Sequence, residues 1–112
     1  MSQHEFQACI EACVHCAEAC EHCANSCLGE KEIQMMSECI RLDRDCAEIC
    51  WTAAALMSRG STFAAELCRV CADICEACGN ECSKHAADHC QHCAEACSSC
   101  ADECRKMAGA WA

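Results

Sequence analysis

The sequence predicts an all-α fold, an antiparallel up-down-up-down four-helix bundle with a cysteine-lined core. Two observations lead to this prediction. The 112 residues contain no proline and only four glycines, so little in the chain interrupts long helices. The 19 cysteines recur mostly in steps of three and four residues, which places them on one face of each helix. A β-strand would instead need steps of two.

Three of the four predicted helices carry an unbroken cysteine stripe. The three- and four-residue steps are the spacing of inward positions in a helical bundle. The stripes repeat one another, so a single helix is the repeating unit. They consist of Cys9, Cys13, Cys16, Cys20, Cys23 and Cys27; of Cys68, Cys71, Cys75, Cys78 and Cys82; and of Cys90, Cys93, Cys97, Cys100 and Cys104.

The remaining segment keeps the same period but replaces some of the cysteines. Cys39, Cys46 and Cys50 continue the stripe, and Asp43 occupies the inward position between the first two. A carboxylate on a buried face is costly without a partner, so we expect Asp43 to pair with an arginine or with Asn80. The other inward positions of this segment hold Met36, Ala53 and Met57.

Capping signals predict where the helices begin and end. Ser2 and Glu5 form a capping box for the first helix, Gly29 ends it, and Ser61 or Thr62 caps the third. These signals predict helices at residues 3–28, 31–58, 62–83 and 87–108 within a single domain, residues 1–112. The connections are short, so neighbouring helices should be antiparallel.

The charge of the chain argues against two classes of partner. Its formal net charge is −10, whereas nucleic acids and anionic membranes attract basic patches. The first residues carry neither the basic nor the apolar region of a signal peptide, and no uncharged apolar stretch reaches about 18 residues. We therefore expect a cytoplasmic protein that binds no nucleic acid and no membrane, and whose thiols stay reduced.

Several uses of so many thiols fit the pattern less well. An odd number of cysteines without a signal peptide disfavours a disulfide scaffold. A thiol–disulfide oxidoreductase needs one exposed thiol of low pKa rather than a buried column. Iron–sulfur clusters need cysteines that converge from a looped segment, whereas these stripes spread along an axis. Zinc, at four thiolates per ion, is a reasonable alternative, as is a mixture of soft metals.

Cu(I) fits the stripes best. This soft ion prefers thiolate and thioether ligands. Cysteines one turn apart have Cβ atoms about 5–6 Å apart, so an ion bound to two sulfurs at about 2.3 Å could bridge them. One monovalent ion per thiolate neutralises the buried charge, and without metal the protonated thiols pack as small hydrophobes. The sequence therefore predicts a prefolded, non-enzymatic store for multiple Cu(I) ions, with all 19 cysteines as ligands.

The two ends of the predicted bundle differ in composition. Large apolar side chains gather at one end, and possible metal ligands ring the other. His85 and His89 lie one helical turn apart there, so we predict that they bind metal and that metal reaches the core at this end. The apolar end holds Phe6, Leu56, Met57, Phe63, Leu67, Met107 and Trp111; the other holds Cys27, Met35, Met36, Cys82, His85, His89 and Cys90.

Three segments together resemble the cytosolic copper storage proteins of bacteria. They are residues 39–50 (CIRLDRDCAEIC), 71–79 (CADICEACG) and 85–90 (HAADHC). The resemblance covers essentially the whole chain. It implies four-helix protomers that assemble into a homotetramer, and Cu(I) held along each core by cysteine thiolates. It also implies storage of copper in the cytosol rather than catalysis.

Overall fold

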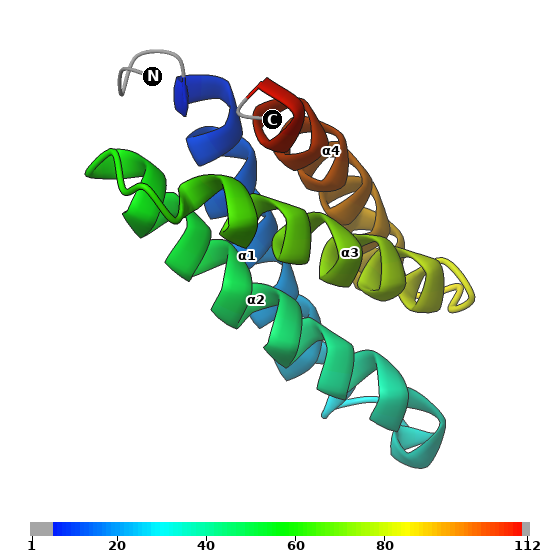
Figure 1. Cartoon of the computed structure of the whole chain (residues 1–112). Coiled ribbons are helices and arrows are strands. Elements are labelled where there is room, and N and C mark those ends of the chain that lie inside the picture. The colour runs from blue at the N-terminus through cyan, green and yellow to red at the C-terminus, as the bar shows by residue number, and fades with distance from the viewer. Residues whose placement is uncertain (1–5, 111–112) are drawn as a thin grey trace.

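The computed structural model describes residues 6–110, which form four α-helices and no strand. The helices are α1 (Gln7–Cys27), α2 (Ser37–Ser58), α3 (Ala64–Cys82) and α4 (Asp88–Ala110), and a short 3-10 helix, η2 (Ile33–Met36), precedes α2. Each helix packs against its neighbours in the chain, and α1 also packs against α4, which closes the bundle (Figure 1). The predicted four-helix bundle is therefore confirmed.

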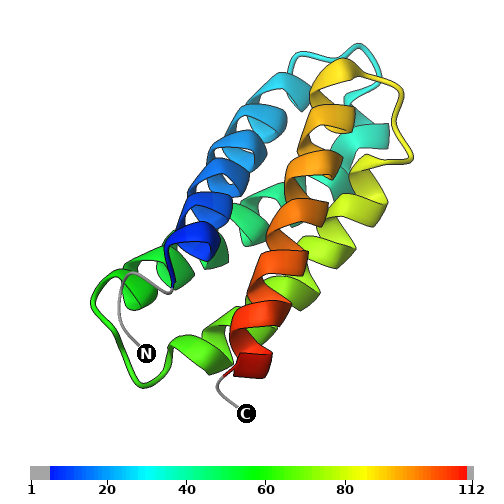
Figure 2. The same cartoon turned by 90° about the horizontal axis from the view of Figure 1, so that it is seen from above.

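Successive helices run in opposite directions, so the bundle has two distinct ends (Figure 2). The blue start of α1 and the red end of α4 lie near the green connection, residues 59–63, at what we call the closed end. The cyan and yellow connections, residues 28–36 and 83–87, lie together at the opposite end, which we call the mouth. The Cα trace measures 46 × 19 × 18 Å, so the core is a long and narrow column.

The helix boundaries differ from the prediction mainly at the start of α2. The sequence predicts a helix from residue 31, whereas α2 begins at Ser37. The intervening residues form turns and η2, because the chain must first cross the roughly 8–10 Å between two helix axes. Ser61 accepts a hydrogen bond from the Phe63 backbone N–H at 3.1 Å, in a turn ahead of α3. The predicted capping box of Ser2 and Glu5 lies outside the described residues.

Cysteine and alanine fill almost the entire core. Every cysteine is buried, and among residues 6–110 the only larger apolar side chains buried with them are Phe6, Met36 and Met57. Half-buried aliphatic side chains such as Ile40 and Ile74 pack against this core. A protonated thiol behaves as a small hydrophobe. The thiols can therefore hold the bundle together before any metal binds.

The closed end is plugged by fewer side chains than predicted. Phe6 is 1% exposed and Met57 is fully buried. Phe63 is 64% exposed, however, so its predicted place in the plug is wrong. It stands one residue before α3, and the first helical residue, Ala64, takes the inward position instead. Trp111 lies outside the described residues.

Candidate metal centre

The thiols form a column along the axis of the bundle. Sulfur atoms that neighbour each other across helices lie 3.4–4.0 Å apart. The shortest separations join α2 to α3, with 3.4 Å between the Sγ atoms of Cys39 and Cys82 and 3.5 Å between those of Cys46 and Cys75. All 19 cysteines are free thiols. The column therefore brings together sulfurs from every helix.

Contacts within one helix are as close as contacts between helices. The sulfurs of Cys16 and Cys20 lie 4.0 Å apart, and those of Cys46 and Cys50 lie 3.9 Å apart. The period of the stripe predicts these pairs, since both members belong to one helix. Cys16 also contacts Cys46 and Cys97 at 3.8 Å each, on two other helices. Each thiol thus has possible partners in several directions.

Sets of four thiols recur along the column. Within each set the sulfur atoms all lie within 4.8 Å of one another. Successive sets share members such as Cys16 and Cys20, so a single sulfur could bridge two ions. From the closed end to the mouth, such sets are Cys13, Cys71, Cys100 and Cys104; Cys16, Cys46, Cys50 and Cys75; Cys16, Cys20, Cys46 and Cys97; Cys20, Cys78, Cys93 and Cys97; and Cys23, Cys27, Cys39 and Cys90.

The spacing of the sulfurs suits metal binding with little movement. Three sulfurs at about 2.3 Å around one ion in a plane are about 4.0 Å apart, and four in a tetrahedron are about 3.8 Å apart. The cross-helix separations of 3.4–4.0 Å are close to both values. Spacing alone therefore suits trigonal Cu(I) and tetrahedral Zn(II) equally.

Burial keeps two thiols near the mouth, Cys27 and Cys90, protonated while no metal is bound. Burial raises the pKa of Cys90 to about 11, and it raises the pKa of Cys27 as well. A protonated thiol is neutral, so these side chains add no uncompensated charge to the core. Each thiol must lose its proton before it can bind a metal ion.

Asp43 stands inside the column and is surrounded by thiols. Its side chain is fully buried. Its Oδ1 accepts hydrogen bonds from Cys78 at 3.2 Å, from Cys82 at 3.4 Å and from Cys93 at 3.3 Å. Its Oδ2 faces the thiol of Cys39 at 3.8 Å. One carboxyl group therefore connects sulfurs from α2, α3 and α4.

The predicted partners of Asp43, an arginine or Asn80, are therefore wrong, because thiols take their place. Burial, and then the proximity of Cys93, raises the pKa of the Asp43 carboxyl to about 8. The thiol donors offset part of the cost of burying this group. Sequence reasoning placed Asp43 at the inward position between Cys39 and Cys46, but it missed that the surrounding thiols would be its partners.

His89 brings a nitrogen atom to the thiols at the mouth. Its Nδ1 lies 3.5 Å from the sulfur of Cys23, 3.6 Å from that of Cys90 and 4.0 Å from that of Cys27. Its Nε2 is buried and lies 3.7 Å from a carboxylate oxygen of Glu30. A ring with Nε2–H directed toward Glu30 would leave the Nδ1 lone pair facing the three sulfurs.

The structure places His85 differently from His89. The His85 Nε2 lies 2.9 Å from a carboxylate oxygen of Glu81, and the His85 carbonyl accepts a hydrogen bond from Gln91 at 2.6 Å. Within residues 6–110 we find no contact between the His85 ring and a core thiol. The structure therefore brings only one of the two predicted histidines to the thiols, and metal binding by His85 stays a prediction.

Residues 2–109 match the protein family described as copper storage protein. The chain belongs to this copper storage protein family. Its predicted resemblance to these proteins is thereby confirmed, and so is the assignment of the thiol core to Cu(I) storage.

Three relatives of this family member illustrate the match. The cysteine-rich protein YhjQ of Bacillus subtilis (strain 168) is 57% identical over 79 residues, which are 70% of this chain and 73% of YhjQ. The Cu(I)-bound copper storage protein BsCsp3 is 56% identical, with a TM-score of 0.89 over 92% of this chain and 97% of its own. A cytosolic copper storage protein from Streptomyces lividans, with five coppers, is 39% identical, with a TM-score of 0.91 over 96% of this chain and 94% of its own.

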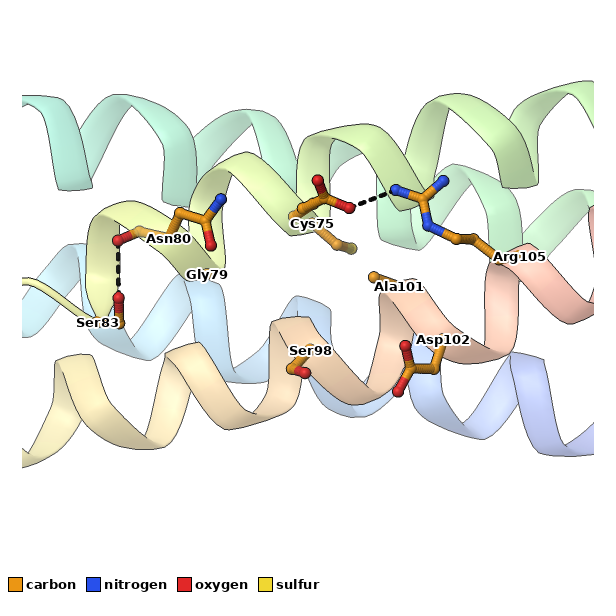
Figure 3. Close-up of a pocket in the computed structure, with 9 residues that line it drawn as sticks. Cys75, Gly79, Asn80, Ser83, Ser98, Ala101, Asp102 and Arg105 are labelled. Carbon is orange, nitrogen blue, oxygen red and sulfur yellow. Dashed lines mark hydrogen bonds and ion pairs between the residues drawn. The ribbon is translucent and has the colours of Figure 1, made fainter.

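The outer surface of this family member is separated from its thiols. A pocket of about 280 Å³ opens between α3 and α4 (Figure 3). Arg105 borders the pocket and donates a hydrogen bond to the Glu76 carboxylate at 2.6 Å. This ion pair neutralises the charge of the Arg105 guanidinium. Gly79 lets the two helices approach, since a Cβ there would lie 3.2 Å from the Cβ of Cys97. Cys75 lines the inner side of the pocket but is fully buried, so the pocket gives no open path to the core.

No helix within residues 6–110 has an apolar stretch long enough to cross a lipid bilayer.

Proposed function

We propose that this chain stores many Cu(I) ions along its thiol column, in the cytosol and without catalysing a reaction. The observation that carries the proposal is the column itself, in which free and buried thiols from all four helices approach within 3.4–4.0 Å. The proposed ligands are the 19 cysteines of the four stripes together with His89 and His85.

Loading exchanges protons for ions. In the metal-free core the thiols are neutral, and a Cu(I) ion that displaces a proton leaves the core neutral again. Two thiolates around one ion need a separation of about 4.0–4.6 Å, so the helices need to part only slightly. Because neighbouring four-thiol sets share Cys16, Cys20, Cys46 and Cys97, an ion can pass along the column by exchanging one ligand at a time.

His89 is proposed to receive copper at the mouth. An imidazole nitrogen binds Cu(I) through its lone pair, so coordination by Nδ1 does not require a thiol to lose its proton first. Three thiols lie within 4.0 Å of this atom, among them Cys23 and Cys90. Glu30 would orient the ring through Nε2, as carboxylates do for metal-binding histidines.

Asp43 is proposed to adjust its protonation as the column fills. A thiolate cannot donate a hydrogen bond, so copper binding removes the donors that Cys78, Cys82 and Cys93 provide. A carboxyl group whose pKa is about 8 can stay protonated at neutral pH and donate a hydrogen bond from its O–H to a neighbouring thiolate. The group then adds no second negative charge beside the thiolates.

Burial of the thiols supports a store rather than an enzyme. A redox enzyme needs an exposed thiol of low pKa, whereas every cysteine here is buried and burial raises the pKa of Cys27 and Cys90. We expect alkylation of the metal-free protein to be slow at all thiols. One or two thiols that react far faster than the others would instead favour the oxidoreductase alternative.

We further propose that the bundle assembles into a homotetramer, as the family resemblance implies. Trp51, Phe63 and Val70 are 39%, 64% and 48% exposed, so apolar surface is available for contacts between copies. Sedimentation velocity should give a single species of four chains. A monomer at working concentrations would contradict this part of the proposal.

Anaerobic titration tests the proposed store. Reduced protein is titrated with Cu(I) in the presence of a competing Cu(I) chelator, and in parallel with Zn(II). We expect uptake of more than about ten Cu(I) ions per chain, since thiolates can bridge soft ions. Saturation near four or five ions with a preference for Zn(II), at four thiolates per ion, would instead establish the zinc alternative.

A matched pair of double variants ties the capacity to the core. Cys16 and Cys46 each belong to two of the four-thiol sets, so Cys16→Ala with Cys46→Ala should lower the number of bound ions. His15 and His92 are exposed and stack edge to face on the outer surface, with ring centroids 5.6 Å apart. His15→Ala with His92→Ala should leave the Cu(I) capacity unchanged. Equal loss in both variants would contradict binding in the core.

A further inference from the structure

The closed end of the thiol column stops at a methionine. Met57 is the second-to-last residue of α2, and its side chain is fully buried. Cys68, near the start of α3, donates a hydrogen bond from its thiol to the Met57 Sδ at 3.7 Å. The sequence predicts Met57 as part of an apolar plug, whereas the structure turns its sulfur toward a thiol.

We propose that Met57 is a copper ligand, whose thioether holds the Cu(I) ion at the closed end together with Cys68. The proposal rests on the Cu(I) function proposed above. Cu(I) accepts thioether as well as thiolate ligands. When the ion displaces the Cys68 proton, it occupies the space that this proton held, and a lone pair of Met57 already faces that space.

The separation of the two sulfurs permits such a bridge. Sulfurs bound to one ion at about 2.3 Å are about 4.6 Å apart in a linear arrangement and about 4.0 Å apart in a trigonal one. The hydrogen-bonded sulfurs of Cys68 and Met57 are 3.7 Å apart. They must therefore separate by less than about 1 Å, which small rotamer changes of the flexible methionine can provide.

Two further sulfurs complete this end of the column. Cys9 and Cys104 lie close enough to Cys68 to influence the pKa of its thiol. The sulfurs of Cys9 and Cys104 lie 3.7 Å apart. One sulfur from each helix therefore meets here, and Met57 is the member that carries no charge in any protonation state.

A neutral donor suits the closed end because its surroundings are apolar. Phe6 and Ala64 are buried there, and an additional thiolate would need another cation to balance it. The thioether completes the coordination of an ion that a single thiolate already neutralises. It also favours Cu(I) over Zn(II), since thioether is a soft ligand. Met57 would thus contribute to metal selectivity as well as to capacity.

The other methionines of the described chain provide matched controls. Met35 is 69% exposed, Met36 is buried near the mouth, and Met107 is half-buried. Within residues 6–110 Met57 is the only methionine whose sulfur we find hydrogen-bonded to a thiol. Leucine at positions 35, 36 and 107 should therefore leave the site at Met57 intact.

Selenium X-ray absorption provides the test. A variant with Met35→Leu, Met36→Leu and Met107→Leu is produced with selenomethionine. The three substitutions leave selenium only at positions 1 and 57. The labelled protein is then loaded anaerobically with Cu(I). We expect a selenium–copper distance of bonding length on about half of the selenium atoms. Adding Met57→Leu should remove this distance and lower the Cu(I) capacity by about one ion per chain. Leucine replaces methionine at nearly constant volume, so this variant should fold.

The outcomes separate this inference from the proposed function. Loading of many Cu(I) ions without a selenium–copper distance, or with one that persists after Met57→Leu, overturns the role of Met57 alone. Failure to load Cu(I) at all overturns the proposed store itself. If Met57→Leu does not fold, the distance in the triple variant still decides, because its spectrum does not require that substitution.

Discussion

The two ends of the bundle terminate the same thiol column with different chemistry. At the closed end Phe6 is buried and Met57 turns a thioether toward Cys68. Toward the mouth, His89 places an imidazole nitrogen against thiols, and Asp43 places a carboxyl group inside the column. One end of the column is capped by two side chains without an ionisable group, Phe6 and Met57. The other contains groups that gain and lose protons.

This difference suggests a division of roles along one repeated motif. Ions must exchange their ligands and protons where they enter and leave, and nitrogen and oxygen groups support such exchange. Ions deep in the column need only be held, and neutral sulfur with apolar packing suffices for that. The ends can therefore be distinguished by substitutions that affect stability, pH dependence or loading rate.

The largest expected effect concerns packing at the closed end. Phe6→Ala removes a side chain that is 1% exposed and should lower the free energy of unfolding of the metal-free protein by about 3–5 kcal/mol. Leu28→Ala is the control, since Leu28 is 57% exposed and its substitution should cost less than about 0.5 kcal/mol. Chemical denaturation under reducing conditions measures both. Similar losses for the two variants would contradict the described closed end.

The next effect concerns the carboxyl group in the mouth half. Asp43 has a pKa of about 8 in the fold against 3.8 ordinarily, so the folded protein keeps this proton while the unfolded chain loses it. The resulting stability is present below pH 4 and is lost as the pH rises toward 8. The metal-free protein should therefore become less stable between pH 5 and pH 8, by about 2–4 kcal/mol.

Asp43→Asn should flatten that pH dependence, because an amide does not titrate in this range. The exposed Asp45→Asn provides the control and should keep the wild-type slope. Denaturant midpoints at several pH values, measured with thiols reduced and metal absent, compare the three proteins. Thiols whose pKa is raised by burial, such as Cys27 and Cys90, contribute only above about pH 9, outside the range measured. If stability depends on pH as steeply in Asp43→Asn as in the wild type, this carboxyl group is not the source of the pH dependence.

The smallest effect concerns the rate at which copper enters. His89→Ala removes the Nδ1 that lies 3.5 Å from Cys23, and we expect Cu(I) loading to slow by about threefold to tenfold with little loss of capacity. His85→Ala removes a ring that is hydrogen-bonded to Glu81, so its effect on the rate should be smaller. Stopped-flow mixing with a Cu(I)–chelator complex gives both rates. Slower loading by His85→Ala than by His89→Ala would reverse the assignment of the receiving histidine.

Much of the fold and of the thiol site follows from local rules. The steps of three and four residues place every cysteine on an inward helix face, and the structure buries all 19 of them. Short connections give antiparallel neighbours, which in turn separate an apolar end from an end with histidines. These features depend on the helical period and on chain order, and both can be read from sequence.

Other features depend on how the helices are rotated and shifted relative to one another. That arrangement directs His89 toward Cys23 but His85 toward Glu81, although the two histidines are only four residues apart. It also leaves Phe63 exposed, because α3 begins only at the next residue, Ala64. No spacing rule within one helix predicts either result.

The sequence by itself determined that the core is a cysteine core and that its two ends differ. The tertiary structure decided which sulfurs share a four-thiol set, that thiols surround Asp43, and that Met57 faces Cys68. The physical reason is that a stripe fixes the face on which a side chain lies. Metal ligands must also meet atom to atom within about 4 Å, which requires the packing of all four helices.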